Sequence, residues 1–129
     1  IHNEITIIDD TYNSNLESAK AGIDILSEYK GNQKIAIIGD MLELGELAQD
    51  HHYELGKYIS NSKIDILLAI GSFTQLTVNA ARKVRAVFFH DKEDLIIELM
   101  KIVSSGDVVY VKGSRGMKME AIIKKGLSK

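Results

Sequence analysis

The sequence has no cysteine and no proline among its 129 residues. Without cysteine the chain can form neither a disulfide framework nor a thiolate metal site, which is consistent with a reducing cytosol. No apolar run approaches the ~20 residues that a helix needs to cross a bilayer, so we expect a soluble, cytoplasmic protein without a membrane span. Because no linker rich in proline, glycine or serine interrupts the chain, we expect a single domain.

Charge of one sign is not concentrated anywhere in the chain. The formal net charge is -2, and no basic stripe of the kind that follows a phosphate backbone is present, so nucleic acid is not an expected partner. The length and the 45% content of hydrophobic residues are typical of one globular domain with one core. The chain begins with Ile1 and enters a strand pattern almost at once, so we expect it to be part of a longer protein.

Short runs of β-branched residues alternate with longer segments of helical period, which is typical of βαβ units. We expect strands at residues 5–9, 34–39, 64–70, 85–90 and 107–112. Three of them contain continuous apolar runs, as expected of central strands covered on both faces. The pattern predicts an α/β, three-layer, Rossmann-like domain with a mostly parallel sheet of five to six strands flanked by helices.

Two of the intervening segments carry an apolar stripe at helical spacing. The stripe residues are Leu16, Ala19, Ile23 and Leu26 in one segment and Leu95, Leu99, Ile102 and Val103 in the other. Residues that favour helix starts precede three segments: Ser14 (with Glu17 in a capping box), Asp91 and Ser114. We expect Gly31 and Gly106 to end the helices before them.

Right-handed crossovers place all the loops that follow strands at one edge of a parallel sheet, where open α/β proteins bind their ligands. In this chain those loops are residues 9–15, 39–47, 71–74, 90–92 and 112–116. The first of them holds two carboxylates, a phenol and two amides. Its polar residues suit either turn and capping chemistry or the binding of a nucleotide or peptide, because amides both donate and accept hydrogen bonds.

The loop after the second strand begins with Asp40, at the end of a buried strand where an unpaired carboxylate is costly. We expect this carboxylate either to bind a ligand or to cap a short helical turn. The apolar residues Met41, Leu42 and Leu44 that follow could form a surface that contacts another molecule or could fold back on the core.

The last loop places Lys112 and Arg115 among glycines at an expected helix start, which suits an anion. It is not a Walker A loop, and a solvated turn is the alternative. No histidine has a second ligand at zinc spacing, so we expect His51, His52 and His90 to be surface or loop-packing residues. Met117 and Met119 are expected to fill the core.

Three segments together resemble a known family. Residues 10–15 (Asp-Thr-Tyr-Asn-Ser-Asn), 39–45 (Gly-Asp-Met-Leu-Glu-Leu-Gly) and 111–115 (Val-Lys-Gly-Ser-Arg) are similar, in order and spacing, to motifs in the C-terminal domain of MurF-type members of the Mur ligase family. His52 also matches a histidine that often follows the second motif. Many members have alanine and proline where this chain has Ser14 and Leu16.

The resemblance implies that residues 1–129 are the C-terminal domain of a longer ligase, whose N-terminal UDP-sugar domain and central ATPase domain are absent. Such a ligase uses ATP and Mg²⁺ to join D-alanyl-D-alanine to UDP-N-acetylmuramoyl-tripeptide, a peptidoglycan precursor. The tripeptide carboxylate is phosphorylated, and the amine of the dipeptide attacks the acyl phosphate. The chain on its own is expected to be inactive.

The resemblance also implies roles for seven residues. Asn15 and Asp40 would contact ATP. Tyr12, Asn13 and Ser72, in the loop of residues 71–74, would face the dipeptide. Lys112 and Arg115 would bind a phosphate or the dipeptide carboxylate. No catalytic residue and no magnesium ligand is expected in this chain.

Phosphoacceptor receiver domains are the main alternative. They share the alternating pattern, an acidic pair comparable to Asp9 and Asp10, and a lysine comparable to Lys112. A receiver needs a phosphorylatable aspartate at the end of its third strand, however, where this chain has Ile70 and Gly71. A Rossmann dinucleotide module is disfavoured because no G-x-G-x-x-G follows the first strand.

Overall fold

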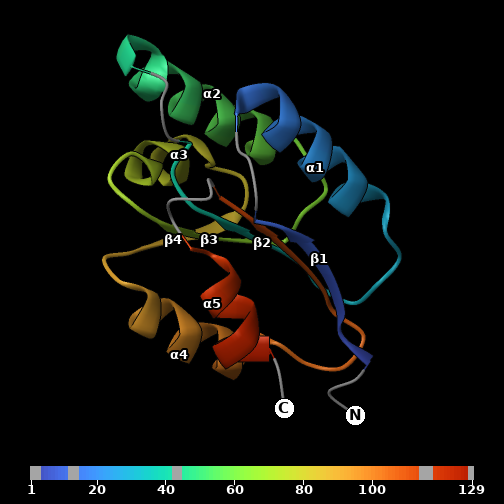
Figure 1. Cartoon of the computed structure of the whole chain (residues 1–129). Helices are drawn as coiled ribbons and strands as arrows, with labels where there is room; N and C mark the ends of the chain where they lie inside the picture. Colours follow the sequence, from blue (N-terminus) through green and yellow to red (C-terminus); the bar gives the residue numbers. More distant parts are fainter. Residues whose placement is uncertain (1–3, 12–14, 42–44, 114–117, 128–129) are drawn as a thin grey trace.

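The computed structural model describes residues 4–11, 15–41, 45–113 and 118–127 of the chain. Its strands are β1 (Thr6–Asp10), β2 (Lys34–Ile38), β3 (Ile66–Ile70), β4 (Arg85–Phe89) and β5 (Val108–Lys112). They form one parallel sheet in the order β1-β5-β2-β3-β4 (Figure 1). Each of the five expected strands is confirmed within two residues of its expected bounds.

The position of each strand in the sheet follows its composition. The three continuous apolar runs belong to β5, β2 and β3, which are the internal strands, and β3 and β5 are buried along their whole length. The edge strands β1 and β4 are partly exposed. A strand covered by helices on both faces has no solvent side for polar residues, which explains the lack of alternation in the internal strands.

Helices cover both faces of the sheet (Figure 1). α1 (Leu16–Glu28), α2 (Ala48–Ser60) and α3 (Thr74–Ala80) lie on one face, and a short 3-10 helix, η2 (Gly45–Leu47), precedes α2. α4 (Lys92–Ile102) and α5 (Glu120–Ile122), which continues as a π-helix, η4 (Ile123–Leu127), lie on the other. The three-layer α/β prediction is therefore confirmed.

The alternation of side chains along each strand divides the core into two layers. Ala36 and Tyr110 face α1 and α2 in one cluster, whereas their neighbours Ile37 and Val111 face α4 and the C-terminal helix in the other. Met119 is fully buried in the second cluster, which confirms its expected role as a core residue. Met117 lies outside the described residues.

The first helix starts one residue later than expected. The N-cap is Asn15, which has an extended conformation and whose Oδ1 accepts a hydrogen bond from the Ser18 N–H at 2.8 Å. Ser18 completes a capping box by accepting from the Asn15 N–H. The predicted pair Ser14 and Glu17 was wrong because an asparagine at the next position caps equally well. Asp91 is confirmed as the N-cap of α4, and Ser114 lies outside the described residues.

The glycines expected to end helices do not do so. α1 and α4 end at Glu28 and Ile102, and their C-caps, Tyr29 and Val103, have extended backbones that any residue adopts. Gly106 instead has a φ of 91° in the turn before β5, a conformation that favours glycine. The prediction that Gly31 and Gly106 end the helices is therefore wrong, because a glycine near the end of a helix need not be its cap.

Gly56 provides a test of the packing of α2 on α3. A Cβ at Gly56 would overlap the backbone carbonyl of Thr77, which cannot move without displacing α3. We expect Gly56→Ala to lower the free energy of unfolding by about 1–3 kcal/mol, although alanine is otherwise favoured over glycine inside a helix. Urea unfolding would measure the loss.

Gly126→Ala is the matched control, because its Cβ would approach side chains rather than backbone, those of Leu99 at 3.1 Å and Ile96 at 3.6 Å. Its cost should be clearly smaller than that of Gly56→Ala. Equal costs for the two substitutions would show that the contact between α2 and α3 is not a tight constraint.

Candidate functional site

The topology of the sheet brings the three loops with family motifs together. β5 lies between β1 and β2, but α5, which follows β5, covers the opposite face from α1 and α2, which follow its neighbours (Figure 1). When two adjacent strands continue into helices on opposite faces of the sheet, a crevice forms at the carboxyl ends of these strands. At this place the N–H of Gly39, which follows β2, donates a hydrogen bond at 2.8 Å to the carbonyl of Lys112, which ends β5. We call this region, at the carboxyl ends of β1, β5 and β2, the switch crevice.

Asp10, at the end of β1, is held by two residues of β5. Its Oδ2 is 2.9 Å from Lys112 Nζ and accepts a hydrogen bond from the Tyr110 hydroxyl at 2.8 Å. Asp10 pairs in register with Lys112, and Tyr110 is two residues earlier on the same face of β5. The Lys112 side chain is 1% exposed, whereas that of Asp10 is 42% exposed. The register of two parallel strands therefore creates this cluster.

The chemistry of Tyr110 is fixed by this environment. Burial raises the pKa of the Tyr110 hydroxyl far above its ordinary value, and the hydrogen bond to the Asp10 carboxylate raises it further. The phenol therefore stays neutral and remains a hydrogen-bond donor at any physiological pH.

Lys112 was expected to bind a phosphate or a substrate carboxylate. The structure instead places its ammonium against the protein's own carboxylate at Asp10, in an almost fully buried position. A contact between Lys112 and a substrate stays a prediction. Arg115, its expected companion, lies outside the described residues.

Asp40 joins the loop after β2 to the loop after β3. Its carboxylate is 3% exposed and accepts hydrogen bonds from the N–H groups of Ser72, at 2.7 Å, and Phe73, at 2.9 Å. These N–H groups directly precede α3. Asp40 therefore does not cap α3, which has no side-chain cap hydrogen bond, but pairs with two N–H groups of the loop before it, and a contact with ATP stays a prediction.

Glycine is required beside this carboxylate. Gly71 has a φ of 137°, and a Cβ at this position would overlap the carboxylate of Asp40. Ser72 is exposed next to it, with its N–H bound to Asp40. The structure thus brings together two of the predicted site residues, Asp40 and Ser72.

His52 fixes the start of the loop after β2. Its Nδ1–H donates to the Ala48 carbonyl at 2.6 Å, and its Nε2 accepts from the Met41 N–H at 2.9 Å. The ring is fully buried and stacks on Phe73, with the ring centroids 5.3 Å apart. The expectation of a loop-packing residue is confirmed for His52, and the surface alternative is wrong.

The hydrogen bonds of His52 require a neutral ring with the proton on Nδ1, since Nε2 must accept. Burial is the main cause that lowers the pKa of His52 below its ordinary value of 6.5. The Ala48 carbonyl and the Asp40 carboxylate partly oppose this effect, and His51 adds to it. Met41 is 1% exposed, so this apolar residue of the loop folds back on the core. Leu42 and Leu44 lie outside the described residues.

The loop after β1 is described in part. Asn15 is exposed and uses its Oδ1 to cap α1, while Tyr12 and Asn13 lie outside the described residues. Sequence reasoning missed the role of Tyr110. Tyr110 could have been found from its spacing of two residues from Lys112, which places both side chains on one face of a strand.

Two searches of the described part of the chain gave negative results. It contains no group of three or more histidine, cysteine, aspartate or glutamate residues that could hold a metal ion. None of its helices is long and apolar enough to cross a membrane.

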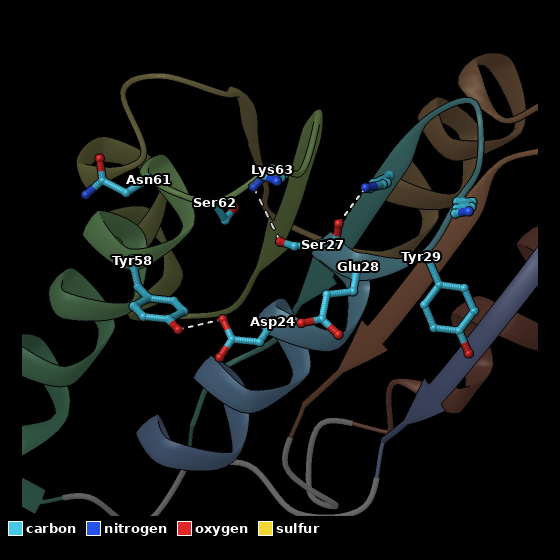
Figure 2. A pocket seen from close by; sticks show the side chains of 10 residues that line it. Asp24, Ser27, Glu28, Tyr29, Tyr58, Asn61, Ser62 and Lys63 are labelled. Atoms are coloured by element: carbon cyan, nitrogen blue, oxygen red, sulfur yellow. Dashed lines mark hydrogen bonds between the residues drawn. The ribbon is translucent and has the colours of Figure 1, made fainter.

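A cavity of about 850 Å³ lies at the opposite edge of the sheet, between the C-terminal ends of α1 and α2 (Figure 2). Tyr58 points toward Asp24 there and donates a hydrogen bond to it at 2.5 Å. Ser27 accepts through its hydroxyl from the Lys63 N–H and through its carbonyl from Lys34 Nζ. Because this cavity lies at the amino ends of β2 and β3, it is separate from the switch crevice.

The state of His52 can be tested through the pH dependence of stability. Because its pKa is lowered on folding, the unfolded chain binds a proton here at higher pH than the folded chain does. The stabilisation is therefore complete above pH 6.5 and is lost as the pH falls through the folded-state pKa. We expect the thermal midpoint to fall more steeply between roughly pH 7.5 and pH 5 in the wild type than in His52→Gln.

The control for this measurement is His90→Gln, which removes an exposed histidine after β4. Its pH profile should follow that of the wild type. If the thermal midpoint fell equally steeply with pH in the wild type and in His52→Gln, protonation of His52 would not be linked to folding.

Comparison with known proteins identifies relatives along most of the chain. The family model of the Mur ligase, glutamate ligase domain, matches residues 1–115. The UDP-N-acetylmuramoyl-tripeptide--D-alanyl-D-alanine ligase of Bacillus subtilis is 37% identical over 125 residues, which cover 93% of this chain and 27% of that protein. The protein of the same name from Haemophilus influenzae is 35% identical over 125 residues, 92% of this chain and 26% of that protein. The chain thus spans about a quarter of the length of these relatives.

Solved structures agree with the sequence relatives. MurF from Acinetobacter baumannii matches with a TM-score of 0.89 and 25% identity, over 98% of this chain and 29% of that chain. The MurF ligase from Thermotoga maritima in complex with ADP matches with a TM-score of 0.82 and 28% identity, over 95% of this chain and 28% of that chain. With a family match over residues 1–115 and the same fold, this chain belongs to the Mur ligase family and carries its glutamate ligase domain.

Proposed function

We propose that this chain is the C-terminal domain of a MurF-type, ATP-dependent ligase that joins D-alanyl-D-alanine to UDP-N-acetylmuramoyl-tripeptide. The observation that carries the proposal is the meeting, at the switch crevice, of the loops after β1, β2 and β5, which bear the three family motifs. The names of the curated relatives support the choice of substrates. A cytoplasmic location is part of the same proposal.

The described residues fit an adenine nucleotide at this crevice. Asn15 is exposed at the start of α1 and commits only its Oδ1 to the helix cap, so its side-chain N–H groups are available to a base or a ribose. The solved relative with bound ADP has the same fold. We therefore assign ATP to the side of the crevice formed by the loops after β1 and β2, with Asn15 and Asp40 as its contacts.

The dipeptide is assigned to the neighbouring loops. Ser72 is exposed beside Asp40, in the loop held by that carboxylate, and with Tyr12 and Asn13 it would face D-alanyl-D-alanine. Lys112 and Arg115 would supply positive charge for the dipeptide carboxylate or for a phosphate. We assign to these loops the binding and orientation of substrates, and no catalytic role.

The phosphoryl-transfer chemistry belongs to another part of the ligase. The described residues contain no group of three or more metal-ligating side chains, and we assign Mg²⁺ to a central ATPase domain. When that domain phosphorylates the tripeptide carboxylate, the amine of the dipeptide attacks the acyl phosphate and phosphate leaves. The present domain would close over this centre and exclude water.

The receiver-domain alternative has no support. β3 ends at Ile70 and is followed by Gly71, so no aspartate stands where a receiver is phosphorylated. The matched family is a ligase domain along residues 1–115.

The function can be tested by comparing this chain with a full-length ligase that ends in it. We expect the full-length protein to release phosphate only when ATP, UDP-N-acetylmuramoyl-tripeptide and D-alanyl-D-alanine are all present. Residues 1–129 alone should neither hydrolyse ATP nor form the product. Ligation by the isolated domain, or a full-length protein that does not need the dipeptide, would contradict the proposal.

Asp40→Ala in the full-length ligase tests the ATP assignment. Loss of two hydrogen bonds to a charged group should destabilise the domain by about 2–3 kcal/mol, and loss of an ATP contact should raise the KM for ATP about tenfold. Steady-state kinetics and thermal unfolding measure the two effects.

Gly71→Ala is the matched variant, because it displaces the same loop and keeps the carboxylate. An equal rise in the KM for ATP in both variants would show that Asp40 acts only by shaping the loop. An unchanged KM in Asp40→Ala would remove Asp40 from the ATP site.

A further inference from the structure

One buried side chain of α2, that of His52, contacts both the loop after β2 and the loop after β3. Its Nε2 accepts a hydrogen bond from the Met41 N–H at 2.9 Å, and its ring stacks on that of Phe73, with the ring centroids 5.3 Å apart. Its Nδ1–H binds the Ala48 carbonyl, one turn earlier in α2, at 2.6 Å, and this bond fixes the orientation of the ring. Through one ring, α2 therefore sets the positions of two loops.

The Asp40 carboxylate joins the same two loops beside this ring. Its Oδ2 accepts a hydrogen bond from the Ser72 N–H at 2.7 Å, and its Oδ1 accepts one from the Phe73 N–H at 2.9 Å. The same Oδ1 lies 3.9 Å from His52 Nε2. While the ring is neutral, Nε2 has no hydrogen, and Oδ1 stays with Phe73. A protonated Nε2 would point its hydrogen at the Met41 N–H, which is also a donor, and would attract Oδ1 away from Phe73.

Packing alone does not account for a histidine at this position. The ring is fully buried, and a buried polar ring costs free energy unless its nitrogens are hydrogen-bonded, whereas leucine would fill a similar space without polar atoms. The two loops that the ring contacts hold Asp40 and Ser72, the residues assigned above to ATP and to the dipeptide. We propose that His52 is a positioning residue of the substrate site, whose neutral ring holds the loops after β2 and β3 in the arrangement that binds substrates.

The effect on binding follows from the populations of the loops. A loop that adopts several arrangements binds more weakly, because the apparent dissociation constant is the intrinsic one divided by the fraction in the competent arrangement. This inference rests on the proposed function, which supplies ATP and D-alanyl-D-alanine as the two ligands. Since the ring contacts both loops, its loss should weaken the binding of both.

The same geometry makes substrate binding sensitive to pH. In the described part of the chain, the ring is acted on by the Asp40 carboxylate, which favours the protonated form, and by His51, which disfavours it. Thr77 of α3 and Phe73, which also contact His52, carry no charge. Burial lowers the pKa of His52 below its ordinary value of 6.5, so the ring is neutral at about pH 8 and gains a proton only as the pH falls through that lower pKa.

The test uses the full-length ligase with His52→Leu and His52→Gln. Leucine removes the acceptor for the Met41 N–H, whereas the carboxamide oxygen of glutamine can still accept. At about pH 8, His52→Leu should raise the KM for ATP and the KM for the dipeptide about fivefold each, with kcat within about twofold, and His52→Gln should keep both KM values within about twofold. A purely structural role would instead reduce the amount of active enzyme, and so kcat, without changing KM.

The pH profile is the second measurement. Lowering the pH from about 8 to about 5.5 should raise both KM values more in the wild type than in His52→Gln, which has no ring to protonate. Because the substrates also titrate in this range, the variants are compared with one another at each pH. His90→Gln, which removes an exposed histidine after β4, is the matched control and should follow the wild type.

Thermal unfolding verifies that each variant is folded at each pH, and if His52→Leu is not, the profiles of the wild type and His52→Gln decide. Two results would overturn the inference while the wild type still ligates. One is a folded His52→Leu with wild-type KM values for both substrates. The other is an equal rise of the KM values in the wild type and in His52→Gln as the pH falls. A wild-type ligase that forms no product would overturn the proposed function and, with it, this inference.

Discussion

The insertion of β5 between β1 and β2 is the constraint on which the rest of the structure depends. Among the residues that the structure describes, β1 pairs only with β5, and β5 carries a second parallel ladder to β2. The last strand of the chain therefore connects the first strand to the body of the domain. Without β5 the sheet would lose its first strand, and the loops after β1 and β2 would lose the strand that lies between them.

The same insertion creates the switch crevice. The helices that follow β1 and β2, α1 and α2, cover one face of the sheet. The helix that follows β5, α5, covers the other face. The parallel register then places Asp10 beside Lys112. A shift of the register by one residue would turn Lys112 toward the opposite face of the sheet, and the contact with Asp10 would be lost. The contact between Asp10 and Lys112 thus depends on strand pairing as much as on residue type.

Buried polar groups in this domain serve mainly to fix loops. Asp40 binds the N–H groups before α3, and His52 binds the N–H of Met41. A hydrogen bond that satisfies a buried polar group adds little net stability, but its loss leaves the partner unpaired at a cost of about 1–3 kcal/mol. These contacts therefore select one conformation of each loop.

Much of the fold could be predicted from local patterns. The β-branched runs located five strands within two residues, and the continuous apolar runs identified β5, β2 and β3 as internal. These features are local, because the burial of a segment dictates its own composition. The cap of α1 was misplaced by one residue because Ser14 and Asn15 are both good caps, and only the backbone geometry chooses between them.

The site was predicted only in outline. The motifs indicated which loops to assign to a site, because their residue types and order are properties of the sequence itself. The sequence by itself thus determined the fold class, the strand positions and the loops that bear the family motifs. Only the tertiary structure decided that Lys112 lies against Asp10, that Asp40 binds the N–H groups before α3 and that His52 is buried. These contacts join residues 102, 32 and 11 positions apart in the chain. Strand order and register, which no local pattern encodes, bring the first two together, and the packing of α2 beside the end of β2 brings the third.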